Sequence, residues 1–183
     1  MTADLEQGRR AGNAGEAEAE WQLFLQSGVL EILAAAVHEL FLESLSTEER
    51  RSNPAAVPYE HLPDHLKEQN RDNVRDMANK LTLAGYSISQ SLDDKYPVDF
   101  SDPLVDQMAR QEHQRWMNVK LAKGWRYGTE TVRAQKQHSS LVPWEALPES
   151  EKRKDSDLVR HIPRILAKAG CIIVKIETDT AES

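Results

Sequence analysis

Histidine and aromatic side chains recur at a spacing that suits the binding of a planar molecule. His113 lies three residues before Trp116, and His38 lies three residues before Phe41. On a helix such residues share one face. In one interpretation Trp116 and Phe41 stack on a nucleobase, a contact that contributes roughly 1–3 kcal/mol per base. In the other, each His is buried and satisfied by a backbone carbonyl, and the aromatic ring is core filler.

A second cluster follows in the segment Gly124-Trp125-Arg126-Tyr127-Gly128. It is either a tight turn whose aromatic side chains pack on the core, or a loop that lines a ligand. In the second case the flanking glycines would let backbone N–H groups approach an anion. The cationic side chains near this loop are Arg115, Arg126, Arg133, Lys136 and His138.

The residue types give little support to catalysis. The neighbours Glu112-His113 and His38-Glu39 have no Ser or Cys nucleophile in a recognisable setting. The chain has no glycine-rich phosphate loop, Walker motif or dinucleotide fingerprint. His61 and His65 have a metal-ligand spacing, but Pro63 between them breaks a helix there. We expect no enzyme activity, no cofactor and no metal site.

Composition restricts the class of partner. The 183-residue chain has a net charge of −7 and one cysteine, Cys171. We expect an acidic chain without a basic block to bind neither duplex nucleic acid nor an anionic membrane. The polar residues 1–20 do not resemble a secretory signal, and no apolar run is long enough to span a bilayer. We expect a cytoplasmic protein.

The elements that must position these residues come from an internal repeat. Residues 57–88 and 142–173 align without a gap at an offset of 85, and 13 of 32 positions are identical. Upstream the register continues at an offset of 75, with His38 opposite His113. The second copy therefore holds ten extra residues, within the stretch that contains residues 124–128. A duplication of this kind predicts two similar structural units.

Hydrophobic periodicity predicts that each copy consists of a helix, an extended loop, a second helix and a short strand-like tail. We predict a mainly α fold of two pseudo-twofold-related helix–loop–helix repeats with at most short strands, and a cleft where the repeats meet. The predicted parts are a flexible N-terminal segment (1–20), the first repeat (21–92), a linker (93–102), the second repeat (103–176) and a C-terminal tail (177–183).

Local signals set some helix boundaries. Asp102 is expected to cap a helix with Pro103 at its first position, and Gly124 to end it. The second helix of each copy begins either at the N-cap residues Asn70 and Asp155 or at an earlier turn that starts at Pro63 and Pro148. Pro163 is expected to kink its helix or restart it. Residues 171–176 are expected to form one short strand.

Three segments carry a family resemblance: residues 112–116, residues 124–128, and residues 136–144 with Leu147-Pro148. Together they resemble the ryanodine-receptor repeat domain, over residues 103–176 and, without the Gly-Trp-x-Tyr-Gly segment, over residues 37–88. The resemblance implies an all-helical two-repeat fold without known catalysis. It also implies paired repeats able to hold an adenine nucleotide, with bacterial members as sensors of nucleotide-derived signals or as recognition modules.

These observations favour a non-catalytic module that senses or sequesters a nucleotide or nucleotide-derived metabolite in the cleft between two repeats. The alternative is a protein–protein interaction module without a small-molecule ligand, and the third hypothesis is an enzyme acting on a nucleotide or glycan. The predicted ligand-binding residues are His38, Phe41, His113, Arg115, Trp116, Trp125, Tyr127, Lys136 and His138.

Overall fold

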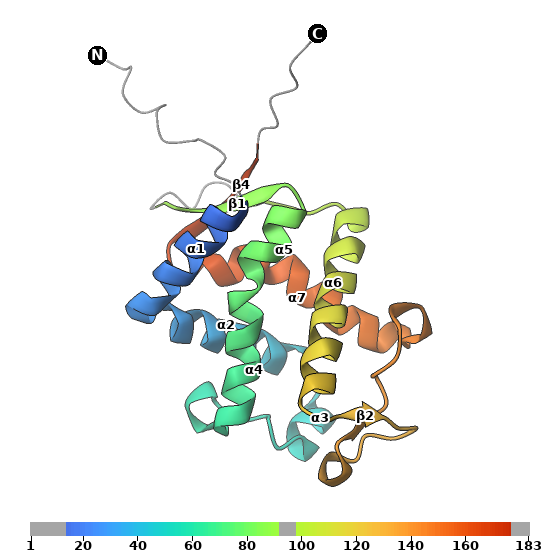
Figure 1. Cartoon of the computed structure of the whole chain (residues 1–183). Coiled ribbons are helices and arrows are strands. Elements are labelled where there is room, and N and C mark those ends of the chain that lie inside the picture. Colours follow the sequence, from blue (N-terminus) through green and yellow to red (C-terminus); the bar gives the residue numbers. More distant parts are fainter. Residues whose placement is uncertain (1–13, 92–97, 177–183) are drawn as a thin grey trace, which may run out of the picture. The chain divides into compact units, whose positions relative to one another are not determined.

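The computed structural model describes residues 14–91 and 98–176, and these residues are mainly helical (Figure 1). Their strands are short and pair in two two-stranded sheets. The predicted mainly α fold class is therefore confirmed. No helix of the described residues is long and apolar enough to cross a membrane.

The chain divides into two compact units. The first unit holds residues 14–91 together with residues 163–176, and the second unit holds residues 98–162. The boundary after Ile162 lies within one continuous helix. Each unit is described separately below.

The first unit begins with helix α1 (Ala14–Phe24), a π-type turn (Leu25–Val29) and helix α2 (Leu30–Ser44). Gly28 adopts a φ of 92° between the two helices, a conformation that other residues rarely adopt. The expected flexible segment 1–20 is thus helical from Ala14 onward, and residues 1–13 lie outside the described part. Trp21 is buried, and its Nε1 donates a hydrogen bond to the carbonyl of Val74.

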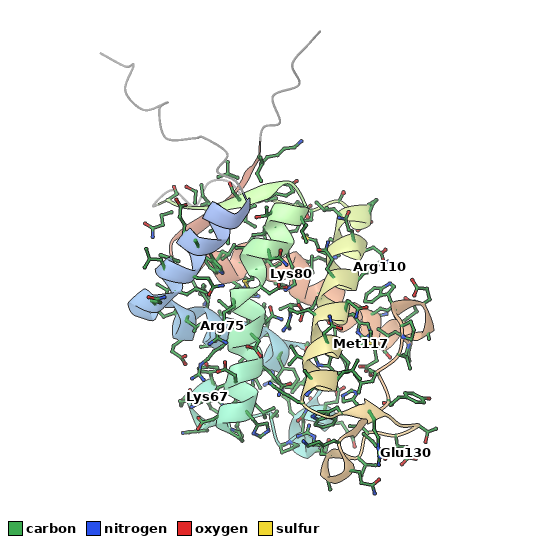
Figure 2. The ribbon with its side chains drawn as sticks, in the orientation of Figure 1. Lys67, Arg75, Lys80, Arg110, Met117 and Glu130 are labelled. Carbon is green, nitrogen blue, oxygen red and sulfur yellow. The ribbon has the colours of Figure 1, made fainter. Side chains whose placement is uncertain are left out.

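Helix α3 (Thr47–Ser52) and a 3₁₀ turn (Tyr59–His61) lead to α4 (Asp64–Arg75) and α5 (Met77–Leu83). Helix α4 starts directly after Pro63, as the earlier of the two predicted starts required. Along α4 and α5 the side chains of Lys67, Arg75 and Lys80 follow one another (Figure 2). Helix α2 packs against α4, and α1 packs against α5.

Strands β1 (Tyr86–Gln90) and β4 (Cys171–Lys175) close the first unit as an antiparallel pair (Figure 1). Ile88 lies opposite Ile173, its equivalent in the repeat, and the pairing is symmetric about these two residues. A short strand-like tail was expected in each repeat, with residues 171–176 as one short strand. The structure shows that both tails are strands and that they pair with each other.

The second unit is built on helix α6 (Asp102–Ala122). Its N-cap is Ser101, so the expected capping role of Asp102 is wrong. The Asp102 carboxylate instead accepts a hydrogen bond from Arg160 at 2.5 Å. Gly124 follows the helix with a φ of 78°, as expected for the residue that ends it.

Two very short strands, β2 (Arg126–Tyr127) and β3 (Gln137–His138), pair in parallel after α6, with a 3₁₀ turn (Arg133–Gln135) between them. A further 3₁₀ turn (Trp144–Ala146) precedes α7 (Glu149–Ala167). Helix α7 begins after Pro148 and continues through Pro163, so the expected restart at that proline is wrong. The helix accommodates Pro163 by giving up one backbone hydrogen bond.

The core positions follow the repeat. In the first unit Leu81 and Leu166 are equivalent residues and both are fully buried. The second unit has its own core, which includes Phe100, Val105, Met108, Ala109, Leu141, Trp144, Leu147, Val159 and Ile162.

Candidate functional site

His113 is the buried centre of the second unit's polar site. The ring is 4% exposed, and Nε2 donates a hydrogen bond of 2.8 Å to the carbonyl oxygen of Val142. It stacks on Trp116 at 5.7 Å between ring centroids and lies 5.9 Å from the ring of Trp144. Because a carbonyl oxygen only accepts, Nε2 must carry the hydrogen.

His38 repeats this arrangement in the first unit. Its Nε2 lies 2.7 Å from the carbonyl oxygen of Val57, and its ring stacks on Phe41 at 5.5 Å. Tyr59, the equivalent of Trp144, lies 6.2 Å away. The interpretation of both histidines as buried groups satisfied by a backbone carbonyl is therefore confirmed. Phe41 lies in the first unit and Trp116 in the second, so each ring is described only against residues of its own unit.

A pocket of about 220 Å³ opens beside His113 within the second unit. Its walls come from α6, from β3 and the residues that follow it, and from the start of α7. The lining residues are His113, Trp116, His138, Ser140, Leu147, Glu151, Lys154 and Asp155.

His113 and Asp155 face each other across this pocket. The distance from Nδ1 of His113 to Oδ2 of Asp155 is 3.6 Å, longer than an ordinary hydrogen bond. Burial works to lower the pKa of His113, but Asp155 and the carbonyl of Val142 favour the charged ring, and the pKa is raised overall. Burial also raises the pKa of Asp155. Both raised pKa values favour a state in which His113 and Asp155 share a proton.

Arg115, one of the predicted ligand cations, is bound to a buried carboxylate. Its Nε and a terminal nitrogen donate to the two oxygens of Glu112 at 2.9 and 2.5 Å. Glu112 is 3% exposed, so this two-bond pair keeps its charge compensated. The structure therefore gives Arg115 a supporting position next to His113 and not a place among the lining residues.

His138 lines the pocket as a neutral ring. Its Nδ1 accepts a hydrogen bond of 3.1 Å from the backbone N–H of Ser140. The ring meets Trp116 edge-on at 4.9 Å and lies 6.1 Å from Trp125. Burial lowers the pKa of His138, and the nearby charge of Lys120 lowers it further.

The start of α7 supplies a hydrogen-bonded wall. Oγ of Ser140 donates to Glu151 at 3.1 Å, and Nζ of Lys154 lies 2.6 Å from the other oxygen of that carboxylate. Burial alone would raise the pKa of Glu151, but Lys154 and Ser140 lower it overall. Glu151 therefore stays ionised and is paired within the wall.

Lys120, at the C-terminal end of α6, lies over two tryptophan rings. Nζ is 4.6 Å from the ring centroid of Trp125 and 5.8 Å from that of Trp116. Burial lowers the pKa of Lys120, and the charges of Lys123 and Arg133 lower it further. A half-buried ammonium group close to other cations is a favourable place for an anion.

The loop at residues 124–128 does not present its backbone to an anion. The N–H groups of Gly124, Trp125, Arg126 and Gly128 all donate to carbonyl oxygens of the chain. The proposed approach of an anion to these groups is therefore wrong. Tyr127 is 56% exposed, so it does not pack on the core either.

The structure brings only part of the predicted site together. His113, Trp116 and His138 line one pocket. Trp125 lies beside this pocket, with its ring near His138 and under Nζ of Lys120. Lys136 and Tyr127 are exposed, and Nζ of Lys136 donates to the carbonyl of Lys123. His38 and Phe41 lie in the first unit.

Sequence reasoning missed the remaining lining residues. A usable signal existed, because the repeat alignment pairs neutral Leu66, Gln69 and Asn70 with Glu151, Lys154 and Asp155. Those are positions where one copy is charged and the other is not. The other residues missed are Lys120, Ser140 and Leu147.

Ser140 is the hydroxyl side chain among the residues that line the pocket. Its hydroxyl donates to the carboxylate of Glu151, which also pairs with Lys154, while Nδ1 of the adjacent His138 accepts from a backbone N–H. Among residues 14–91 and 98–176 no group of three His, Cys, Asp or Glu residues could hold a metal ion. The buried Cys171 lies in the first unit, and burial raises the pKa of its thiol.

Residues 99–175 of the chain match the RyR domain family. The matched stretch contains the whole second unit from Asp99 onward, including every residue that lines the pocket. It also contains the continuation of α7 and strand β4.

Proposed function

We propose that this chain, which carries an RyR domain over residues 99–175, is a non-catalytic module that binds a nucleotide or nucleotide-derived metabolite. The observation that carries the proposal is the pocket of about 220 Å³ in the second unit. There the indole of Trp116 and two imidazoles surround a space that is also lined by Asp155. Flat rings combined with a few polar groups suit a planar, hydrogen-bonding ligand.

The size of the pocket supports a ligand that is only partly enclosed. Pockets that bury a drug-sized molecule usually measure about 300–1,000 Å³. The space beside His113 is smaller than that, at about 220 Å³. We expect it to hold a nucleobase and part of a sugar, with the remainder of a nucleotide extending toward solvent.

The way the polar groups are paired supports a binding role. Glu112 is paired with Arg115, Glu151 with Lys154 and Ser140, and Nε2 of His113 with a carbonyl. Such groups are held in place and shape the pocket. We accordingly propose sensing or sequestration of the ligand, in a cytoplasmic setting consistent with the single buried thiol.

A protein-interaction module is the second candidate. Three large apolar side chains of the first unit, Leu23, Ile32 and Leu83, are 69%, 52% and 59% exposed. Exposed leucines and isoleucines favour contact with a partner when they form a continuous patch. This candidate predicts binding that is lost on changing those residues and unaffected by Trp116.

A thermal-shift screen with a nucleotide library tests the first candidate. A ligand present at about 100 times its dissociation constant should stabilise the folded protein by about 2.7 kcal/mol. Trp116→Leu removes the aromatic wall and keeps apolar volume, so binding should be lost while circular dichroism stays native. Phe41→Leu is the matched control in the first repeat and should bind as wild type.

Three outcomes count against the proposal. If no nucleotide shifts the melting temperature, the ligand class is wrong and the interaction module becomes the better explanation. If Phe41→Leu also abolishes binding, the first repeat contributes to the site and the pocket of the second unit is not sufficient. Retained binding in Trp116→Leu would show that the ligand lies elsewhere.

A further inference from the structure

Residues 120–136, which we call the basic segment, gather positive charge in an acidic chain. They run from the end of α6 through β2 to the turn before β3, all within the second unit. Five basic residues and one acidic residue give the segment a charge of +4, so the remaining residues carry −11 and the whole chain −7. The basic residues are Lys120, Lys123, Arg126, Arg133 and Lys136.

Several of these cations lie close to one another. Nζ of Lys136 donates to the carbonyl oxygen of Lys123 at 2.9 Å, which brings its ammonium group to the end of α6. The pKa of Lys120 is lowered by burial and then by the charges of Lys123 and Arg133, so both lie within electrostatic range of it. Because like charges repel, an anion that approaches this cluster is attracted by several cations at once.

The exposed arginines of the basic segment have no carboxylate partner. Among residues 14–91 and 98–176, neither Arg126 nor Arg133 forms an ion pair. Glu130, which lies in the loop after β2 (Figure 2), forms none with those residues either. Elsewhere in the same unit, Arg110 pairs with two carboxylates and Arg160 with one. The charges of Arg126 and Arg133 are therefore available to an acidic group of another molecule.

Main-chain hydrogen bonds hold the basic segment in a fixed loop. The N–H of Arg126 donates to the carbonyl of Lys136 at 2.9 Å, and Val132 and Gln137 exchange hydrogen bonds of 3.0 and 3.1 Å. Lys136 has a φ of 51°, a left-handed conformation that persists only when the surrounding structure imposes it. A surface that is already ordered loses little conformational entropy when a partner binds.

Two exposed apolar side chains accompany the cations. Leu121, in the last turn of α6, is 53% exposed and follows Lys120 in the chain. Tyr127 is 56% exposed and follows Arg126 in β2. The surface therefore offers apolar contact as well as charge. Tyrosine and arginine together are enriched at protein–protein interfaces and among the residues that contribute most to binding there.

We propose that the basic segment is a docking surface for an acidic segment of a partner protein, in which Asp or Glu residues flank a large apolar side chain. The carboxylates pair with Arg126 and Arg133, and the apolar side chain packs on Tyr127. A short acidic segment covers this cluster alone, whereas a long polyanion would also run beside residues that carry −11. The surface is separate from the nucleotide pocket, because none of these three side chains lines it.

Fluorescence anisotropy of the full-length protein with four labelled probes tests this surface. The first probe is a short peptide in which Asp and Glu flank a central Leu-Phe pair. The second replaces Asp and Glu by Asn and Gln, and the third replaces Leu-Phe by Ala-Ala. The fourth is an oligothymidylate of similar length. The first peptide should bind about tenfold more tightly than each of the others, and added salt should weaken it.

The double variant Arg126→Gln/Arg133→Gln tests the charge. Both side chains are exposed, so circular dichroism and the melting temperature should match wild type. Binding of the first peptide should weaken about tenfold and depend less on salt. The matched control is Arg51→Gln/Arg153→Gln, which removes two exposed arginines outside the basic segment and changes the net charge equally. It should alter the affinity by less than about twofold.

Tyr127→Ser tests the apolar contact. The variant should weaken the first peptide about fivefold to tenfold and change the Ala-Ala peptide by less than about twofold. Leu23→Ser is the matched control, because Leu23 is 69% exposed in the first unit. It should leave both affinities unchanged. Equal weakening of the two peptides by Tyr127→Ser would overturn the packing of an apolar side chain on this tyrosine.

Three further results would overturn the acidic partner. The first is no binding of the first peptide up to about 1 mM, or equal affinity in Arg126→Gln/Arg133→Gln and its control. The second is tighter binding of the oligothymidylate that the same variant abolishes, which assigns the surface to single-stranded nucleic acid. The third is dimerisation that this variant abolishes, which makes a second copy the occupant. The nucleotide pocket is tested by Trp116→Leu, so the two proposals fail separately.

Discussion

The two repeats place the same three groups in the same relation and surround them with different charges. In each, a buried histidine donates to the carbonyl of the valine before Pro58 or Pro143 and stacks on the aromatic residue three positions later. The repeated part therefore fixes the loop onto the first helix. This role needs no ligand, because the hydrogen bond satisfies a buried carbonyl and the ring fills the core.

The difference lies in what faces that histidine. The second repeat has Glu151, Lys154 and Asp155 where the first has Leu66, Gln69 and Asn70, and its ten extra residues lie in the stretch that forms β2 and β3. A duplicated unit can thus keep its structural centre while one copy acquires a polar pocket. Binding residues are to be sought where the copies diverge, and structural residues where they agree.

The largest predicted effect tests the part that the repeats share. Leu81 and Leu166 are equivalent and fully buried, so replacing either by Ala should cost about 2–5 kcal/mol of unfolding free energy. Chemical denaturation measures both losses, and they should agree within about 1 kcal/mol if the two environments are alike. Leu83→Ala, at a 59% exposed position, is the control. Losses below about 1 kcal/mol at both buried sites would contradict the assigned core face.

The next effect concerns a buried charge that only one repeat contains. Lys80 is 1% exposed and pairs with Asp76 at 2.9 Å, whereas the equivalent position of the second repeat holds Ile165, also 1% exposed. Desolvation of a buried ion pair often outweighs its attraction, so replacing both partners in the double variant Lys80→Ile/Asp76→Asn should stabilise the protein by about 1–4 kcal/mol. Asn79, which donates to Asp76, can still donate to the amide oxygen that Asp76→Asn introduces.

Chemical denaturation of the double variant Lys80→Ile/Asp76→Asn beside Lys168→Ile checks this expectation. Lys168 is half exposed in the same unit, so its replacement should give no comparable gain. A marked loss of stability in the double variant would mean that the buried ion pair holds α5 in place.

Much of the fold could be predicted from the sequence, because the same apolar pattern occurs in both copies of the repeat. The apolar spacing of Val74, Met77 and Leu81 matches that of Val159, Ile162 and Leu166, and all six are buried. The pairing of β1 with β4 could not be predicted, since residues 171–174 are only a short apolar run and residues 86–90 include two serines and a glutamine. Helix α1 was missed because Trp21 and Leu25 are buried within an otherwise polar, Ala-rich stretch.

The site was only partly accessible for a related reason. Motif residues such as His113 and Trp116 stand out by type, but Asp155 and Lys154 resemble any charged residues on an exposed helix. Only the packing of α7 beside α6 gives them a role. Arg115 shows the reverse error: a conspicuous cation is bound to the buried Glu112.

Removing the histidine hydrogen bond should affect the two repeats about equally. His38→Phe and His113→Phe keep a flat ring but leave the carbonyl of Val57 or Val142 without its donor. Each should cost about 1–3 kcal/mol, measured by chemical denaturation at pH 7.5. His→Gln at each site, which restores an N–H donor, is the control and should recover part of the loss. A large loss at only one site would show that the repeated centre supports only one unit.

The smallest effect isolates the charge that distinguishes the second repeat. The folded-state pKa of His113 is raised above its usual 6.5, so this group's stabilisation is present below about pH 6.5 and is lost as pH rises through the folded pKa. The pKa of Asp155 is also raised, above its usual 3.8, so its ionisation costs stability as pH rises through that folded value. At a pH above both folded pKa values, Asp155 is ionised opposite a neutral ring.

Asp155→Asn replaces the carboxylate by an amide that can donate to Nδ1 of His113. The variant should melt about 2–4 °C above wild type at pH 8.5 and lose that advantage at pH 6, where wild-type His113 can carry the second proton. Glu145→Gln is the control: a backbone hydrogen bond and Arg110 lower the pKa of Glu145, so the difference from wild type should be the same at both pH values. A difference between Asp155→Asn and wild type that does not change with pH would show that His113 and Asp155 do not share a proton, and that the two repeats differ in shape but not in titration.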